Sequence, residues 1–202
     1  MRPVSFMFVL ALAASFEARQ PQTSQLPVAT EFRVFAGREE ITDTSLLRIT
    51  PSGVREGMIA VGPARRLTVS LSPGIYDVQA FRTRQDAIVA IKWAERLVIM
   101  NYPDEGGRHL EVINFEPGFG ALQVRSQKNP IANYVVDVFP AGDRTDAAKS
   151  LAGEDSLLFI LQARRYDIRV RPAGARDDPN DTRWMLDVEV PSDRTRLKLI
   201  DE

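Results

Sequence analysis

The second half of this sequence repeats the first. Residues 71–78, which read LSPGIYDV, align with residues 161–168, LQARRYDI, at an offset of about 90 residues. Both tryptophans of the chain, Trp93 and Trp184, fall at equivalent places in the two halves. A period this long is typical of duplicated domains, because solenoid repeats run roughly 20 to 50 residues. The sequence therefore predicts two domains of one kind, at 31–116 and 118–202.

Within each half, apolar residues recur at every second position. The alternating segments include 67–71 (LTVSL), 76–80 (YDVQA), 186–190 (LDVEV) and 197–199 (LKL). This period is typical of strands with one buried face, and clusters of Pro, Gly, Asn and Asp separate the segments as turns. We therefore expect an all-β fold of two tandem antiparallel β-sandwiches, immunoglobulin-like or prealbumin-like, related by internal duplication. Only residues 146–151 have the pattern of a helical turn.

The composition excludes several classes of function. The chain has 202 residues, 44% of them hydrophobic and 26% charged, which is ordinary for globular domains. A net charge of -1 argues against a basic surface for nucleic acid or anionic lipid. The absence of cysteine removes disulfides, thiolate metal sites and cysteine nucleophiles. We expect no cofactor and no nucleic-acid partner.

The first residues have the pattern of a secretory signal peptide. One positive charge at Arg2 precedes an apolar run over residues 4–14 and then small residues, so cleavage is expected roughly between residues 13 and 18. The run is shorter than the roughly 20 residues that a membrane-spanning helix needs, and an uncleaved anchor or a buried helix are the alternatives. Residues 1–18 are thus a predicted signal peptide, and the polar residues 19–30 a flexible lead. We expect a periplasmic or secreted protein with no transmembrane segment in the mature chain.

Each half carries a Tyr-Asp pair at the start of a strand. A tyrosine in phase with core residues buries its ring and needs a partner for its hydroxyl, commonly a backbone carbonyl at a sandwich corner. We therefore interpret Tyr76 and Tyr166 as structural rather than as catalytic acids or stacking platforms. Asp77 and Asp167 point the other way and are expected to be solvated.

The two tryptophans are the candidate ligand-binding residues. An exposed indole face is what carbohydrates stack against, so Trp93 or Trp184 could form a sugar-binding surface. Their repetition at the start of an alternating run favours a core or interface position instead. Both interpretations remain open at this stage, and the environments of the two residues can differ between the halves.

Other clusters of polar residues have simpler interpretations. Residues 176–181 (RDDPND) bring oxygen ligands together, as calcium requires, but lack EF-hand spacing, so a solvated Asp-Pro turn is favoured over a calcium site at 177–181. Residues 180–182 also fit a glycosylation acceptor. His109 is the only histidine and is expected to precede a strand, and no Gly-x-Ser-x-Gly elbow accompanies it. The sequence therefore predicts no catalytic, cofactor-binding or metal-binding residues and no enzyme activity.

Residues 71–78 and 166–170, each followed by a basic residue, a tryptophan and an apolar strand, resemble a known type of domain. They are similar to the carboxypeptidase regulatory-like, prealbumin-like β-sandwich units of bacterial exported proteins, which also occur as accessory units in some von Willebrand factor A proteins. The second unit departs from this pattern, with Ala163-Arg164 in place of Pro73-Gly74. The resemblance implies a non-catalytic accessory or interaction module.

The leading hypothesis is therefore an exported module that binds another exported or cell-envelope protein, with its oligomeric state open. One alternative is a carbohydrate-binding protein that uses an exposed tryptophan. A second alternative, an enzyme, would need a pocket that unites His109 with carboxylates and a nucleophile.

Overall fold

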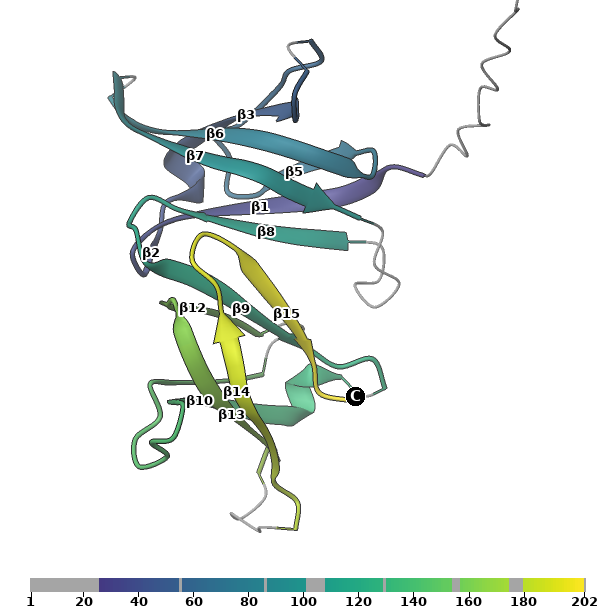
Figure 1. Cartoon of the computed structure of the whole chain (residues 1–202), viewed down its shortest axis with the longest axis vertical. Helices are drawn as coiled ribbons and strands as arrows, with labels where there is room; N and C mark the ends of the chain where they lie inside the picture. Colours follow the sequence, from purple (N-terminus) through teal and green to yellow (C-terminus); the bar gives the residue numbers. More distant parts are fainter. Residues whose placement is uncertain are drawn as a thin grey trace, which may run out of the picture.

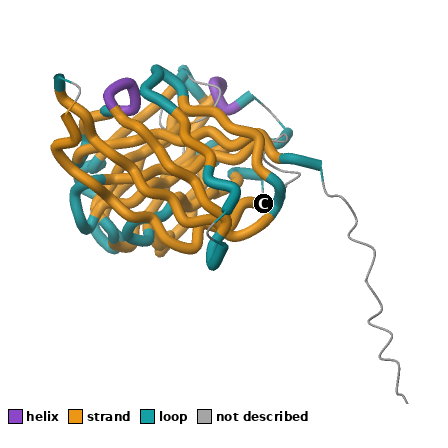
Figure 2. Tube along the Cα trace, turned by 90° about the horizontal axis from the view of Figure 1, so that it is seen from above, coloured by secondary structure: helices purple, strands orange, loops and turns teal. Residues whose placement is uncertain are grey.

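The computed structural model describes residues 26–54, 56–85, 87–100, 108–128, 130–153, 157–174 and 180–201. In these ranges the chain is all-β, with two β-sandwiches stacked along the long axis of the molecule (Figure 1). The only helical elements described are two single 3₁₀ turns, η1 (Thr42–Thr44) and η3 (Ile131–Asn133), at the margin of the strands (Figure 2). The predicted fold class, an all-β sandwich, is confirmed.

The first sandwich consists of two four-stranded sheets. In one sheet, β1 (Val28–Ala36) pairs antiparallel with β2 (Glu39–Glu40) and with β5 (Leu67–Leu71). In the same sheet, β1 pairs parallel with β8 (Arg108–Asn114). The other sheet has the antiparallel order β4-β3-β6-β7, with strands Ile59–Val61, Ser45–Pro51, Gly74–Arg84 and Ala87–Ile99.

The second sandwich has one sheet of three strands and one of four. The three-stranded sheet has the order β12-β9-β15, with strands Leu157–Gln162, Phe119–Arg125 and Thr195–Leu199. The other sheet has the order β11-β10-β13-β14, with strands Lys149–Ala152, Tyr134–Pro140, Arg164–Pro172 and Arg183–Val190.

The two sandwiches share one pairing scheme. Strands β9, β10, β13 and β14 pair as β1, β3, β6 and β7 do, and the parallel pair β9–β15 matches β1–β8. The 3₁₀ turns η1 and η3 also occupy equivalent places, before β3 and β10. The shared scheme agrees with the sequence repeat, and a common origin of the two units stays a prediction.

Alternating apolar residues form a separate core in each sandwich. The first core lies between the two sheets and includes Phe32, Leu47, Val78 and Leu97. The second includes Leu122, Phe159 and Ile168. Burial of these side chains is the main stabilising contribution in a chain without disulfides.

Two boundaries differ from the sequence prediction. Strand β1 begins at Val28, inside residues 19–30, because Val28 is buried and pairs with Leu71. Residues 146–151 contain the start of β11 rather than a helical turn, because Lys149 and Ser150 pair with β10. The predicted signal peptide lies outside the described residues.

The Tyr-Asp pairs make the same hydrogen bonds in both sandwiches. The hydroxyls of Tyr76 and Tyr166 donate to the carbonyls of Ser72 and Gln162, at 2.7 and 2.9 Å. The predicted structural role of both tyrosines is therefore confirmed.

The aspartates hold a β-bulge in the next strand. Asp77 Oδ1 accepts a hydrogen bond from the amide of Arg96 (2.8 Å), and Asp167 Oδ1 accepts one from the amide of Asp187 (3.0 Å). Arg96 and Asp187 both have φ of 56°, and each lies where its strand has one residue more than its partner. The prediction that Asp167 is solvated is wrong, since it is buried and its carboxylate also accepts from Arg144 (3.0 Å).

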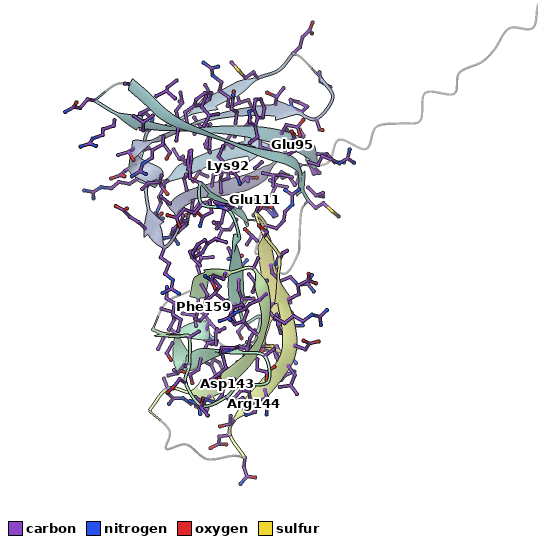
Figure 3. The ribbon with its side chains drawn as sticks, turned by 60° about the vertical axis from the view of Figure 1, so that its left-hand side comes forward. Lys92, Glu95, Glu111, Asp143, Arg144 and Phe159 are labelled. Atoms are coloured by element: carbon purple, nitrogen blue, oxygen red, sulfur yellow. The ribbon has the colours of Figure 1, made fainter. Side chains whose placement is uncertain are left out.

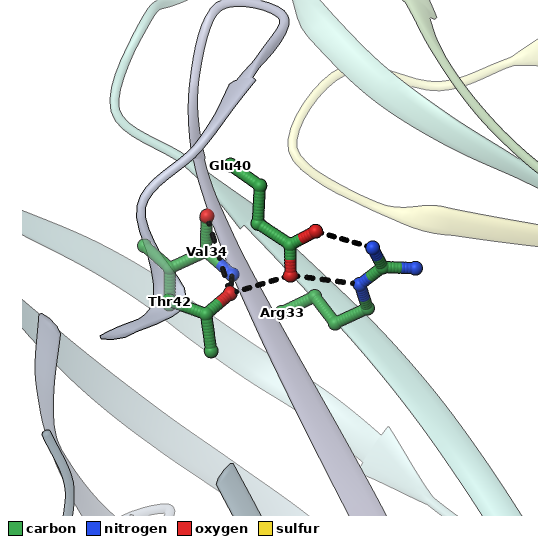
Figure 4. Close-up of polar contacts among 4 residues, drawn as sticks. All are labelled: Arg33, Val34, Glu40 and Thr42. Carbon is green, nitrogen blue, oxygen red and sulfur yellow. Dashed lines mark hydrogen bonds and ion pairs between the residues drawn. The ribbon is translucent and has the colours of Figure 1, made fainter. Parts of the chain in front are cut away.

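An ion pair between Arg33 on β1 and Glu40 on β2 stabilises the β1–β2 turn of the first sandwich (Figure 4). Arg33 donates two hydrogen bonds to the carboxylate of Glu40, and the Thr42 hydroxyl donates to the same carboxylate at 2.9 Å. Thr42 Oγ1 in turn accepts from the amide of Val34 at 3.0 Å. Burial raises the pKa of Glu40, but the bonds from Arg33 and Thr42 outweigh it and leave the pKa below its usual range.

A third apolar cluster joins the two sandwiches. It contains Phe35 and Val112 from the first sandwich and Ala121 and Ile160 from the second. Asn114 lies 2% exposed beside it: its amide oxygen accepts from the amides of Gly37 (2.9 Å) and Glu116 (3.0 Å), and its amide nitrogen donates to the Gly37 carbonyl (2.7 Å). The short connection between the sandwiches is therefore bonded to the body of the first one.

Candidate functional site

The outer surface of the first sandwich carries an exposed apolar patch on β6 and β7. We call it the β7 face and define it by residues with exposed fractions of 42–55%: Ile75, Ile88, Ile91, Trp93 and Val98. Register places them on one side of the sheet, since Trp93 lies opposite Gln79 and Ile91 opposite Phe81, which alternate with the core residues Val78 and Ala80. Clustered exposed apolar side chains of this kind mark interaction surfaces.

Strand β7 is also the last strand of its sheet, but the second sandwich contacts part of it. Lys92 Nζ lies 2.8 Å from Asp193 Oδ1, and Arg194 donates to the carbonyl of Glu95 at 2.6 Å. Figure 3 shows Lys92 and Glu95 above the junction of the two sandwiches. An inward-facing lysine on an edge strand opposes the addition of a further strand. The outer face of β7, rather than its edge, is thus the surface open to a partner.

On the equivalent surface of the second sandwich, arginine and phenylalanine side chains of the same sandwich cover the tryptophan. Trp184 is half-buried, with the guanidinium groups of Arg144 and Arg169 at 4.7 and 5.9 Å from its ring centre and the Phe139 ring at 5.4 Å. Carboxylates hold both arginines in place: Asp167 binds Arg144 at 3.0 Å, and Asp137 binds Arg169 at 2.9 Å. Such cation–π stacks use the indole faces that a ligand would need.

The structure therefore separates the two tryptophans that the sequence grouped together. Trp93 is 55% exposed, so of the favoured core or interface positions the core position is wrong for this residue, and an interface position stays a prediction. Trp184 lies on the outer face of its sheet as well, opposite Arg169, and is covered by arginines rather than by the core. Binding of a ligand by either residue stays a prediction.

His109 lies within β8 rather than before it, and it is buried. Its Nε2 atom is 2.8 Å from Glu111 Oε1, so the structure brings the only histidine to a carboxylate two residues away. Thr195 lines a cleft together with His109 and Glu111, and its hydroxyl oxygen accepts a hydrogen bond from the Val112 amide at 2.9 Å. The sequence analysis expected His109 to precede a strand and so missed its pair with Glu111, which forms because both residues lie in β8 (Arg108–Asn114).

Other predicted features fall partly outside the described residues. Residues 175–179, most of the candidate calcium loop, lie outside them. In the described ranges no group of three or more His, Asp or Glu side chains is placed to hold a metal ion. The same ranges contain no helix of the length and apolarity needed to cross a membrane.

In the part of the chain that the structure describes, the fold and this surface define a two-sandwich β protein with a bare apolar sheet face. No protein-family model matches the sequence, and no curated protein matches it.

Three solved structures are among those similar to this chain. The TIE protein of Bacillus anthracis matches 87% of this chain and 33% of its own at 12% identity and a TM-score of 0.29. A putative adhesin from Bacteroides ovatus matches 78% of this chain and 81% of its own at 8% identity and a TM-score of 0.32. A DUF3823 family protein from Bacteroides ovatus matches 85% of this chain and 100% of its own at 12% identity and a TM-score of 0.29.

This chain spans about a third of the length of the first of these proteins. It spans about a quarter of a leucine-rich repeat protein from Bacteroides thetaiotaomicron, which matches at 12% identity and a TM-score of 0.33. Similarity at this level identifies no family.

Proposed function

We propose that this chain is a non-catalytic interaction module that binds an exported or cell-envelope protein through the β7 face. The single observation that carries the proposal is the exposure of Trp93, Ile91 and Val98 together on one sheet face. Tryptophan is the residue type most enriched at the energetic centres of protein interfaces, and surrounding aliphatic side chains exclude water from it. The apolar leader at residues 4–14 supports export to a compartment where such partners occur.

The comparison between the two sandwiches supports the same conclusion. One pairing scheme places a tryptophan at equivalent positions, and the second sandwich covers its copy with Arg144 and Arg169. The first sandwich has Gln79 opposite Trp93, where the second has Arg169 opposite Trp184. The bare copy is the one available to a partner.

The experiment compares the chain lacking residues 1–18 with its Ile91→Lys variant as bait for an envelope fraction of the source cells. Ile91 is 54% exposed, so a lysine there is compatible with the fold and places a charge in the middle of the β7 face. Leu186→Lys, at an exposed leucine of β14 in the second sandwich, is the matched control. A photo-crosslinking residue at position 93 identifies which captured protein touches the face.

We expect one crosslinked partner that is retained by the wild type and by Leu186→Lys and reduced at least tenfold by Ile91→Lys, about 1.4 kcal/mol or more of binding free energy. Equal retention of every crosslinked protein by the Ile91→Lys variant would overturn the proposal.

A carbohydrate is the second candidate ligand, favoured by the exposed indole of Trp93. Sugar sites combine an aromatic platform with polar groups that bind hydroxyls, and Gln79 is the polar side chain directly across from Trp93. The aliphatic neighbours Ile91 and Val98 favour protein over sugar. Titration of the Trp184→Phe variant with a glycan panel tests this candidate: a saturable shift of the Trp93 emission supports it, and an unchanged spectrum removes it.

A further inference from the structure

A cleft between the two sandwiches contains a buried carboxylate oxygen that has no partner among the described residues. Among the described residues, Glu111 is 7% exposed, and its Oε2 atom has no hydrogen-bond partner. Its other oxygen lies 2.8 Å from His109 Nε2. Buried carboxylate oxygens are normally hydrogen-bonded, so an open one that lines a cleft indicates a missing donor.

The cleft has the size and position of a small-molecule site. Its volume is about 380 Å³, and clefts of this size at domain boundaries are common ligand sites. Its lining residues come from β7, β8, β9, the β14–β15 turn and β15. Figure 3 shows Glu111 at the level where the sandwiches meet.

The charged side chains around the cleft indicate that its ligand also carries a negative charge. Three arginines line it, Arg96 from β7 and Arg194 and Arg196 from the second sandwich, against the single carboxylate of Glu111. Guanidinium groups favour a carboxylate or another planar anion. Arg196 is exposed, and Arg194 is held in place by its bond to the Glu95 carbonyl.

Polar and apolar groups next to Glu111 favour hydroxyls over an ammonium group as the donor. A hydroxyl satisfies Oε2 with one hydrogen bond and adds no second buried charge. Gln123, 6% exposed on β9, lines the cleft with an amide that both donates and accepts, which suits neighbouring hydroxyls. Val98 and Leu197 supply apolar surface for the carbon face of a ring.

We propose that this cleft binds a small hydroxylated carboxylate, such as an acidic sugar, with Glu111 accepting from a hydroxyl and the arginines binding the carboxylate. This site meets the β7 face at Val98, which belongs to both, but Ile91 and Trp93 at the centre of that face do not line the cleft. The proposal does not depend on the proposed function.

The experiment is calorimetric titration of the chain lacking residues 1–18 with D-glucuronate, D-glucose, acetate and L-alanine. Glucose lacks the carboxylate, acetate lacks the hydroxyls, and L-alanine replaces the hydroxyl donors with an ammonium group. The variants are Glu111→Gln and Arg196→Gln, with Glu39→Gln at an exposed position of β2 and Ile91→Lys on the β7 face as controls.

We expect saturable binding of D-glucuronate, at least tenfold weaker binding of the other three compounds, and at least tenfold loss in both cleft variants but not in the controls. Arg196→Gln keeps the test valid if Glu111→Gln fails to fold, since Arg196 is exposed. Absence of saturable binding at millimolar D-glucuronate overturns the proposal. Preference for L-alanine, or equal affinity in the cleft and control variants, also overturns it.

Discussion

At the residue scale, the Tyr-Asp pair is a structural device that the chain uses twice. The tyrosine hydroxyl bonds the carbonyl four residues earlier, and the aspartate bonds the amide of a bulge residue on the neighbouring strand. The pair thus fixes the turn before its strand and the register of the strand after it. Sequence alone predicted the tyrosine bond, because a buried phenol needs an acceptor close by.

Removing the tyrosine hydroxyls should lower stability by different amounts in the two sandwiches. Tyr76→Phe loses the bond to Ser72, and we expect the free energy of unfolding to fall by about 1 kcal/mol. Tyr166→Phe loses both the bond to Gln162 and the bond from Arg164 (3.1 Å) at a position 1% exposed, so its loss should be larger. Urea unfolding followed by circular dichroism measures both, and an unchanged midpoint for Tyr166→Phe would contradict the structural role.

Acid should destabilise the second sandwich through Asp167. The backbone amide of Asp187 and the Arg144 guanidinium hold the pKa of Asp167 below its usual range despite its burial. A depressed folded-state pKa contributes stability above the unfolded value of about 3.9, and this contribution is lost as pH falls through the folded pKa.

The Asp167→Asn variant tests this directly, because it has no charge to lose at that position. We expect a smaller drop in the urea midpoint between pH 7 and pH 3 for Asp167→Asn than for the wild type. Asp43→Asn, at an exposed residue of η1, should behave as the wild type does. The same acid-induced drop in Asp167→Asn as in the wild type would show that Asp167 does not contribute.

At the element scale, the bulges in β7 and β14 decide which side chains face outward. Without a bulge, Trp93 would share a face with the core residues Leu97 and Ile99, and Trp184 with Val188 and Val190. The extra residue at Arg96 and at Asp187 reverses the phase, so both tryptophans and the exposed Leu186 lie on the outer face.

The sequence could therefore predict the strands but not the exposure of the tryptophans. Alternation identifies β5 and β6 correctly, because these strands keep one phase through their core residues. A bulge at a non-glycine residue such as Arg96 has no sequence signal of its own, and its anchor, Asp77, is distant in the chain. The cleft at Glu111 was missed for a related reason, since it requires the placement of one sandwich on the other.

Strand β9 depends on a glycine where the chain turns into the second sandwich. A Cβ atom at Gly120 would lie 1.9 Å from the carbonyl oxygen of Pro191, a contact that only backbone movement can relieve. We expect Gly120→Ala to lower the free energy of unfolding by about 3 kcal/mol, in the range of severe packing defects. Gly74→Ala, whose Cβ would meet its nearest atom at 3.5 Å, is the control, and a similarly small effect at both positions would contradict the model of β9 packing.

At the scale of the whole molecule, the two sandwiches are held together by more than the connection between them. The cluster around Phe35 and Ile160, the Lys92–Asp193 ion pair and the Val112–Thr195 hydrogen bond all cross the junction. The β7 face and the cleft at Glu111 are therefore presented at set positions relative to each other.

Asn114 should be important for this arrangement, because its side chain bonds both Gly37 and Glu116. Asn114→Ala leaves buried backbone groups without partners, and we expect a loss of about 2 kcal/mol in unfolding free energy. We also expect faster amide hydrogen exchange at residues 114–120 than in the wild type. Asn133→Ala, at an exposed residue of η3, is the control; unchanged exchange at the junction in Asn114→Ala would contradict the role of Asn114.

The β7 face should be open in the free protein, and fluorescence of single-tryptophan variants measures this directly. In the Trp184→Phe variant the only indole is Trp93, and we predict red-shifted emission that iodide quenches strongly. In the Trp93→Phe variant, Trp184 beneath its two arginines should be quenched less. Blue-shifted, unquenched emission from Trp93 would contradict the prediction, because it would mean that the β7 face is already covered in the free protein.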